Sequence, residues 1–288
     1  MSVIKVNNIT NRDGTSGPVI AGIATVSSTS HLVVPTGRTG TRYADEGENI
    51  VKNGLVLYLD AKHSYQSKTG IGTTLSGAAA SPGSSIDGEP FTWYDMSGYE
   101  NNGTVTSRSG VQSVGFTTEN QGSLLFNGTS GFIDCGNSLS LQLNTGTIAV
   151  WYRADSSNSG YNGIVAKQNA WAIFVKDNNL SSYSWVTNTV TDTGIVVGNN
   201  SWNYSVLTFQ NIFAADISVN NAVLYNNGTV ASNFPLRLNN HEVSVQIGDA
   251  NASQLFGGRI AQVSIYNRAL TAAEILQNYN ALKSRFGL

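Results

Sequence analysis

The stretch WYDMSGYENNGTV, residues 93–105, combines an acid, amides and glycines at the spacing of a tight turn. Asp95 is placed to accept neighbouring backbone N–H groups in an Asx-type turn. Gly98 and Gly103 can take the positive φ angles that such a turn needs. The pattern therefore predicts a hydrogen-bonded turn, followed by a strand that begins at Val105.

Aromatic side chains in the sequence suit a second chemistry, because their faces stack on sugar rings. Trp93 and Tyr99 make a sugar-contact loop an alternative to the turn, and a metal-supported loop is a further alternative. Two more tryptophans lie on short strands in the middle of the chain, where a ligand can reach them. The predicted ligand-binding residues are Trp93, Tyr99, Trp171 and Trp185.

Other reactive groups are few. His31, His63 and His241 lie in three different contexts without an i,i+4 pair, which predicts surface histidines rather than a metal site or a catalytic triad. The single cysteine, Cys135, excludes an intramolecular disulfide, and its neighbours predict a small buried residue. The sequence has no nucleophile elbow, phosphate loop or dinucleotide fingerprint. We therefore expect no catalytic residue, no metal ligand and no cofactor.

The composition limits the class of protein. The chain has 288 residues, 12% of them charged, a formal net charge of -2 and 30 glycines, a balance that favours many strands joined by turns. It has no run of basic residues, so neither nucleic-acid nor membrane-surface binding is predicted. It also has no signal core and no apolar stretch near 18 residues, so we expect synthesis in a cytoplasm and a soluble chain.

Periodicity predicts an all-β fold for most of the chain. Residues 54–61, GLVLYLDA, form a continuous apolar run typical of a strand buried between two sheets. Residues 145–155 alternate instead, and predict one face with Ile148, Val150 and Tyr152 and another with Ala149, Trp151 and Arg153. About a dozen such short strands predict a two-sheet antiparallel sandwich.

Turns and a helix complete the predicted elements. The Asn-Gly pair at 127–128 predicts a hairpin turn between residues 124–126 and 132–134. A second Asn-Gly pair, at 227–228, predicts another hairpin. Residues 63–90 predict a long loop. Thr271 with Glu274 is a capping box before a short C-terminal helix that we expect to cover an edge or open end of the sandwich, and Gly287 can end it.

Residues 1–50 differ from the rest of the chain and predict an extended N-terminal arm. They hold one aromatic residue, and their apolar runs at 19–26 and 32–34 are bracketed by prolines. Such a segment cannot build its own core. We therefore expect it to become ordered when it pairs as an added strand with a partner protein. The predicted domains are therefore an assembly arm, 1–50, and a sandwich, 51–288.

Six motifs in order carry a family resemblance over roughly residues 51–288. They are NGLVLYLDA, WYDMSGYENNGTV, GSLLFNGTSGFIDCGN, TIAVWYRAD, LYNNGTVAS and GGRIAQVSIYNRALTAAEILQNY. Together they resemble the laminin-G-like, concanavalin A-like lectin/glucanase jelly roll, which implies buried roles for Trp151 and Trp202. The arm also resembles leaders on virion structural proteins of tailed phages of marine cyanobacteria.

The sequence departs from this family at two functional motifs. Hydrolases of the glucanase branch carry Glu-x-Asp-x-x-Glu along one strand, because glycan cleavage needs two facing carboxylates. No such spacing occurs here, and Glu242 is alone on its predicted strand. Laminin-G-like relatives often place an acid pair in the last strand to hold calcium, where this chain has Ala261 and Gln262. Asp60 and Asp249 remain as alternative calcium ligands.

The sequence therefore predicts a non-enzymatic phage virion structural protein, either a capsid decoration or a tail or fibre component. Its lectin-like domain is expected to bind host surface glycans, and its arm to bind other virion proteins. We expect it in the virion, as a homo-oligomer or in many copies, after synthesis in the host cytoplasm. The alternatives are a carbohydrate-binding module with no assembly role and a degenerate glycan hydrolase.

Overall fold

The computed structural model describes residues 49–62, 92–108, 114–156, 159–213, 219–250 and 254–288. The chain divides into two units, Met1–Thr41 and Arg42–Leu288, and every described residue belongs to the second. The predicted arm up to residue 48 and the predicted loop at 63–90 lie outside the described residues. Within the described part, no helix has the length and apolar character needed to cross a membrane.

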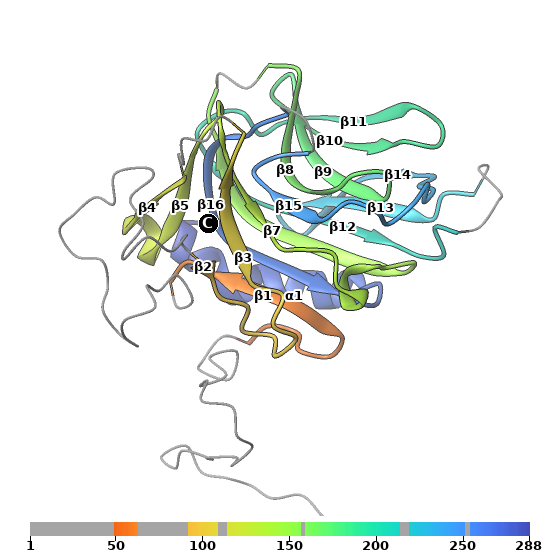
Figure 1. The fold of residues 1–288 in the computed structure, drawn as a ribbon, viewed down its shortest axis with the longest axis horizontal. Coiled ribbons are helices and arrows are strands. Elements are labelled where there is room, and N and C mark those ends of the chain that lie inside the picture. The colour runs from red at the N-terminus through yellow and green to blue at the C-terminus, as the bar shows by residue number, and fades with distance from the viewer. Residues whose placement is uncertain (1–48, 63–91, 109–113, 157–158, 214–218, 251–253) are drawn as a thin grey trace, which may run out of the picture. The chain divides into compact units, whose positions relative to one another are not determined.

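The fold is the predicted two-sheet antiparallel sandwich (Figure 1). Sheet A has the spatial order β14-β13-β12-β7-β16-β5-β4, and β1 also pairs with β16. Its strands are β1 (Leu55–Asp60), β4 (Val114–Thr117), β5 (Ser123–Asn127), β7 (Gly146–Ala154), β12 (Trp202–Phe209), β13 (Ala222–Asn226), β14 (Thr229–Phe234) and β16 (Gly257–Tyr266).

Sheet B has the spatial order β11-β10-β9-β8-β15-β6-β3-β2. Its strands are β2 (Thr92–Trp93), β3 (Gly103–Ser107), β6 (Gly131–Asp134), β8 (Tyr161–Lys167), β9 (Trp171–Lys176), β10 (Asn179–Ser184), β11 (Thr189–Val196) and β15 (Val245–Ile247). The helical elements are η2 (Glu119–Gln121), η3 (Leu139–Leu141), α1 (Ala272–Leu282) and η4 (Lys283–Phe286).

The main core lies between the two sheets and follows the alternation predicted for β7. Ile148, Val150 and Tyr152 belong to this core, whereas Ala149 and Trp151 belong to a separate cluster on the other face. Apolar residues on both faces of one strand mean that sheet A is covered on both sides. The continuous apolar run of β1 has the same explanation.

The C-terminal helix covers the outer face of sheet A, not an edge or open end as predicted. Its capping box is confirmed, since the Thr271 side chain accepts from the Glu274 backbone and the Glu274 carboxylate accepts from the Thr271 backbone. Ile275 and Leu282 are buried against the sheet. A 3₁₀ turn extends the helix to Gly287, whose φ of 75° ends it as predicted.

One predicted hairpin is confirmed and the other is wrong. Asn227 and Gly228, with φ of 49° and 80°, link the neighbouring strands β13 and β14 in a two-residue turn. Asn127 and Gly128 instead end β5 in sheet A, and the chain then enters β6 in sheet B. The Asn127 side chain accepts the backbone N–H of Thr129, so the local turn forms without pairing its two strands.

The sandwich begins slightly before the predicted boundary at residue 51. Ile50 and Val51 are buried in the cluster beneath α1. The Val51 N–H donates to Asn278 Oδ1 at 2.7 Å, and the Tyr266 hydroxyl donates to the Val51 carbonyl at 2.9 Å. The chain is therefore anchored to the C-terminal helix where the described structure starts.

Candidate functional site

The loop before β3 is the hydrogen-bonded turn predicted around Asp95. Asp95 Oδ1 accepts the backbone N–H groups of Tyr58 and Ser97 at 2.8 and 2.9 Å. Asp95 Oδ2 accepts the Ser97 hydroxyl at 2.8 Å and the Asn101 N–H at 3.0 Å. The Asp95 N–H donates to Asn102 Oδ1 at 2.8 Å. One carboxylate thus ties the loop to itself and to β1.

The two glycines of this loop have different roles. Gly98 has a φ of 92°, as predicted, but Gly103 has no positive φ, and Glu100 takes that conformation with a φ of 62°. A Cβ at position 103 would lie 2.4 Å from the Ile133 side chain and 3.4 Å from Cys135 Sγ. Gly103 is therefore explained by close packing between β3 and β6.

Asp95→Ala is expected to lower the free energy of unfolding by about 1–3 kcal/mol, because several part-buried donors lose their acceptor. Glu242→Ala, which removes an exposed acid, is the control and should change little. Urea unfolding of both variants measures the difference. EDTA should leave the melting temperature of the unmodified chain unchanged, and a large loss on chelation would contradict this account of the loop.

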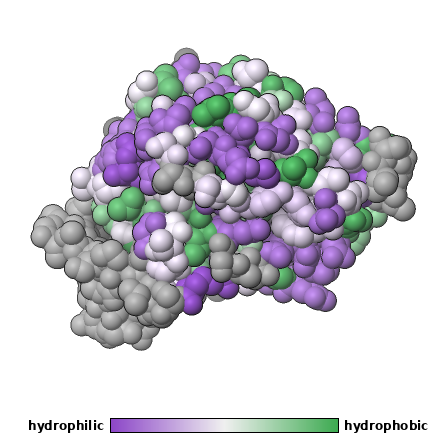
Figure 2. All heavy atoms as spheres, turned by 90° about the horizontal axis from the view of Figure 1, so that it is seen from above, coloured by the Kyte–Doolittle hydropathy of each residue, from purple (hydrophilic) through white to green (hydrophobic). Residues whose placement is uncertain are grey.

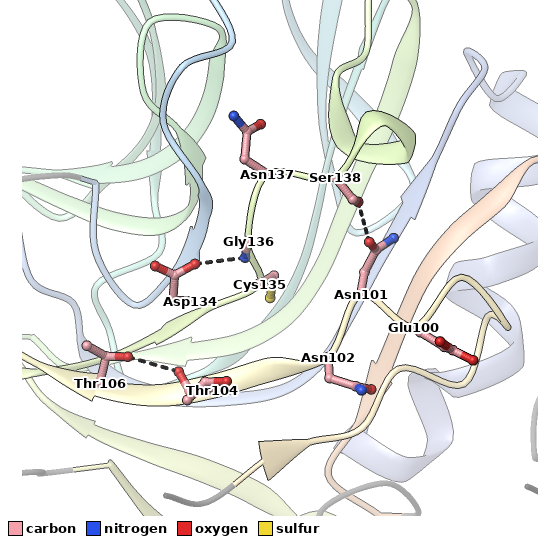
Figure 3. Close-up of a pocket in the computed structure, with 10 residues that line it drawn as sticks. All are labelled: Glu100, Asn101, Asn102, Thr104, Thr106, Asp134, Cys135, Gly136, Asn137 and Ser138. Carbon is pink, nitrogen blue, oxygen red and sulfur yellow. Dashed lines mark hydrogen bonds between the residues drawn. The ribbon is translucent and has the colours of Figure 1, made fainter.

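A shallow polar hollow of about 540 Å³ lies beside this loop (Figure 3). It is lined by residues 100–102, 104, 106 and 134–138. Ser138 donates to Asn101 Oδ1, and Asn101 Nδ2 donates to the Val56 carbonyl at 2.8 Å. Asp134 Oδ1 accepts the Gly136 N–H at 2.7 Å. Both walls of the hollow are therefore held in place by hydrogen bonds.

A buried lysine supports one wall of the hollow. Lys167 Nζ donates to Asn137 Oδ1 and, at 2.7 Å, to the Val243 carbonyl. Burial lowers the pKa of Lys167 to about 8, an effect that the nearby Asp134 carboxylate opposes. Burial, with the Lys167 charge as a smaller cause, lowers the pKa of His241 to about 4. His241 is thus partly buried rather than the surface histidine that was predicted.

His241 should make stability depend on pH between about 4 and 6.5. Its unfolded pKa is about 6.5, so as pH falls the unfolded chain binds the proton first and the folded state loses stability. We expect a lower urea midpoint at pH 5 than at pH 7, and a smaller difference in His241→Phe. If the urea midpoint fell by the same amount in both proteins, the pH dependence could not be assigned to His241.

The outer face of sheet B carries an aromatic surface made of Tyr161, Phe174, Tyr183 and Trp185. Tyr161 contacts Phe174 and Tyr183 edge to face, with ring centroids 5.6 and 5.8 Å apart. Trp185 meets Tyr183 at 5.3 Å and Phe174 at 6.4 Å. Phe174 is buried beneath the other three rings, which remain partly exposed.

The alternation of β9 places this surface outside the main core. Trp171, Ile173 and Val175 belong to the core between the sheets. Ala172 and Phe174 point the opposite way and cluster with the aromatic surface. Side chains at i and i+2 share one face of a strand, so the aromatic surface lies on the outer face of sheet B.

Polar groups surround the aromatic surface. Lys176 Nζ lies 5.5 Å from the Tyr161 ring centroid and 2.6 Å from an Asp177 carboxylate oxygen. The Tyr183 hydroxyl donates to Asn188 Oδ1, and Asn179 Nδ2 donates to an Asp192 oxygen at 3.3 Å. Seen from above, hydrophobic side chains of the protein form separate patches among hydrophilic ones (Figure 2). Rings bordered by hydrogen-bonding groups are the combination that recognises sugars.

The four predicted ligand-contact residues have two different environments. Trp93 and Trp171 are fully buried, so neither ring offers a face to a ligand, and their prediction is corrected to a role in the core. Tyr99 is 53% exposed in the loop before β3, and Trp185 is part of the aromatic surface. The structure does not bring these last two residues together, because Tyr99 precedes β3 and Trp185 follows β10, and these two strands lie far apart in sheet B.

The acids considered as calcium ligands are engaged by arginines. Asp60 pairs with Arg285 at 2.8 Å, and Asp249 pairs with Arg108 at 2.6 Å. Within the described residues, no three His, Cys, Asp or Glu side chains gather in a way that could hold a metal ion. Ala261, at a position where the family resemblance implied an acid, is buried in β16. These acids therefore have structural explanations.

Residues 126–276 match the family model described as the concanavalin A-like lectin/glucanases superfamily. The match spans just over half of the chain. The chain belongs to this superfamily. Among curated proteins, no sequence matches it.

Solved structures share the fold of this lectin-like domain at low sequence identity. The binding domain of Paraclostridial Mosquitocidal Protein 1 is 17% identical with a TM-score of 0.54; the match covers 80% of this chain and 52% of that one. Domain 4 of the extracellular arabinanase AbnA from Geobacillus stearothermophilus, in complex with arabinotriose, is 15% identical with a TM-score of 0.52; the match covers 78% of this chain and 98% of that one.

The binding domain of botulinum neurotoxin DC, in complex with rat synaptotagmin II, resembles this chain about as much as the first two structures do. It is 15% identical with a TM-score of 0.55, and the match covers 81% of this chain and 52% of that one. The chain thus spans about half the length of both toxin domains. At this identity the likeness establishes a common fold.

Most of the aromatic surface of the lectin-like domain was missed from the sequence. Tyr161, Phe174 and Tyr183 are dispersed over three strands, and only the fold brings them together. The sequence of β9 did indicate this surface, because Phe174 lies on the opposite face of the strand from Trp171 and Ile173. Large apolar residues on both faces of a strand indicate a second apolar contact surface.

Proposed function

We propose that this chain is a non-enzymatic virion structural protein of a bacteriophage whose lectin-like domain binds glycans. The aromatic surface on sheet B is the observation that carries the glycan-binding part. Trp185 and Tyr183 present partly exposed rings there, with Asn188 and Asp192 as neighbouring hydrogen-bonding groups. A domain of the same fold in complex with arabinotriose supports this class of ligand.

A non-enzymatic lectin-like domain binds glycans without cleaving them. Hydrolysis needs one carboxyl group as an acid and a facing carboxylate as a nucleophile or base. Two central strands, one from each sheet, carry an acid only just beyond one end. The first, β7, lies in sheet A, whose outer face is covered by α1. The other, β9, has its acidic residue, Asp177, just beyond its end. This placement supports a binding role.

Cleavage is tested by incubating the full chain with laminarin, agar or carrageenan and measuring reducing ends. No release above the buffer control is expected. Glu100 and Asp134 both line the hollow, so Glu100→Gln and Asp134→Asn are the informative variants. Enzyme-like release that either variant abolishes would overturn the non-enzymatic proposal.

Glycan binding is tested by applying the full chain to an array of bacterial surface and marine polysaccharides. We expect concentration-dependent binding to a restricted set of glycans. Binding to none of them would count against the lectin role and would leave assembly as the function of the domain.

The virion role is proposed from residues 1–50. Their composition gives them no core of their own, and their β-prone apolar runs would be a liability if they were left exposed. Pairing with other virion proteins would give these runs a partner, in a capsid decoration or in a tail or fibre. The protein would then be present in many copies in the particle.

Mass spectrometry of purified particles tests whether the protein is a virion component. Deletion of residues 1–45 should leave a folded sandwich that no longer joins particles. Wild-type incorporation of the shortened chain would show that the sandwich makes the docking contacts. Absence from particles, together with glycan binding, would favour the alternative of a free carbohydrate-binding module.

A further inference from the structure

We propose that the polar hollow is a second sugar-contact site, which takes one neutral, hydroxyl-rich sugar residue. This inference extends the proposed glycan binding and rests on it, but it uses residues separate from the aromatic surface. The hollow is formed by β3 with the loop before it and by the end of β6 with the turn after it.

The residues that line the hollow select against charged and apolar ligands. The ten lining residues include the carboxyl side chains of Glu100 and Asp134 and no lysine, arginine or aromatic residue. An anionic ligand would therefore meet like charge at the surface of the hollow, whereas Lys167 behind the wall is buried and already donates to Asn137 and to the Val243 carbonyl. An apolar ligand would find no ring or aliphatic face to cover. Hydrogen bonding to a neutral polar group is the remaining chemistry.

Two side chains at the hollow have complementary groups to offer. Asp134 Oδ1 accepts the Gly136 N–H, and Asp134 Oδ2 has no hydrogen-bond partner within the described part of the chain. Asn102 Oδ1 accepts the Asp95 N–H, and Asn102 Nδ2 likewise has no partner among the described residues. A sugar hydroxyl both donates and accepts, so one hydroxyl can meet the carboxylate acceptor and a different hydroxyl the amide donor.

The side chains at the hollow are held before any ligand arrives. Asp134 and Asn102 are each fixed through one oxygen by a backbone N–H, at 2.7 and 2.8 Å. Asn137 is fixed from both ends, because Lys167 donates to its oxygen and its nitrogen donates to the His241 carbonyl at 2.7 Å. Prior ordering reduces the entropy lost on binding, so a few hydrogen bonds are enough for measurable affinity.

Strand register places the hollow and the aromatic surface on the same face of sheet B. Asp134 in β6 is paired with Thr104 in β3 and with Gln246 in β15. Gln246 is paired with Ala166 in β8, which is paired with Ala172 in β9. Directly paired residues share a face, and these two alanines cluster with the aromatic surface. A glycan of several residues is therefore the ligand that could contact both.

The distance between the two contacts follows from the sheet. Four strand spacings of about 4.8 Å separate β6 from β10, so the sites lie about 19 Å apart.

A divalent cation is the competing occupant of the hollow. Such an ion needs six to eight oxygen ligands, whereas no group of three acidic, histidine or cysteine side chains is present among the described residues.

The test is the amide NMR spectrum of the full ¹⁵N-labelled chain. The probes are the methyl glycosides of glucose, galactose, mannose and N-acetylglucosamine, with calcium chloride in a separate titration. At least one glycoside should shift the amides of residues 102–106 and 134–138. Asp134→Asn and Asn102→Asp should weaken that binding at least about tenfold, since each keeps the oxygen that binds the backbone and changes the free group.

Trp185→Ala is the control that separates the two sites. It should leave the glycoside-induced shifts at the hollow unchanged while it weakens oligosaccharide binding at the aromatic surface. The inference is overturned if no glycoside shifts these amides, if only calcium does, or if both hollow variants bind as the unmodified chain does. Oligosaccharide binding that still depends on Trp185 would then leave the proposed function standing.

Discussion

Trp151→Ala is expected to lower the free energy of unfolding by about 3–5 kcal/mol, as large aromatic truncations in a core do. Trp151 is fully buried on the outer face of sheet A and stacks on Phe286 at 4.3 Å, Tyr204 at 4.9 Å and Tyr279 at 5.7 Å. Two of these partners belong to the C-terminal helical segment. The variant should therefore also loosen the attachment of that segment.

The measurement for Trp151→Ala is urea unfolding followed by circular dichroism. Leu139→Ala is the control, because Leu139 is 85% exposed and its truncation should cost less than about 0.5 kcal/mol. A loss below about 1 kcal/mol in Trp151→Ala would contradict the placement of α1 on sheet A.

Arg285→Ala is expected to cost a similar 3–5 kcal/mol, because it removes the arginine that pairs with the buried Asp60 carboxylate. Arg285 binds both Asp60 oxygens at 2.9 and 2.8 Å, and both side chains are almost fully buried. Its other nitrogens donate to the carbonyls of Asn120 and Gly122 at 2.6 and 2.8 Å. One guanidinium thus joins the C-terminus to β1 and η2.

A double variant separates the pair from the rest of this network. Asp60→Asn combined with Arg285→Met should lose less stability than the two single variants added together. Lys176→Ala breaks the exposed pair with Asp177 and should change the free energy of unfolding little, because water and salt screen that pair. The role assigned to Arg285 would be contradicted if the double variant lost as much stability as the two single variants added together. Equal losses of stability in Arg285→Ala and Lys176→Ala would contradict it too.

The sequence predicted those elements of the fold that depend on contacts between residues close together in the chain. The capping box of Thr271 and Glu274, the turn at Asn227 and the Asx turn at Asp95 each involve residues that are close in the sequence. The alternation in β7 was readable for the same reason. Its two apolar faces predicted burial but did not show that one face meets a helix.

Three local features that depend on tertiary contacts were predicted wrongly or missed. Asn127 and Gly128 carry a hairpin signature, yet β5 and β6 join different sheets, because sheet membership is decided by distant partners. Gly103 is required by the Ile133 side chain across the sheet, which its own neighbours do not reveal. The edge strand β11 was missed, since it is exposed along most of its length and lacks an apolar face.

The candidate site was predicted only in part for the same reason. Trp93, Trp171 and Trp185 are chemically alike, and whether a ring meets solvent depends on the strand face it occupies. Trp185 stays a predicted ligand-contact residue, whereas the rings beside it, which come from β8, β9 and β10, were not identified from the sequence. The loop of Asp95 was identified from sequence, but the hollow beside it also needs the turn after β6.

Glycan binding through the aromatic surface is the role proposed for the lectin-like domain. The most direct measurement is calorimetric titration of the full chain with the glycan that gives the strongest array signal, repeated for Trp185→Ala and for Val186→Ala. Val186 is the neighbouring residue and is 49% exposed. Loss of a stacking ring at a binding hot spot costs about 2 kcal/mol, so Trp185→Ala should bind roughly thirtyfold more weakly and Val186→Ala should bind as the unmodified chain does. Equal affinity of all three proteins would contradict the claim.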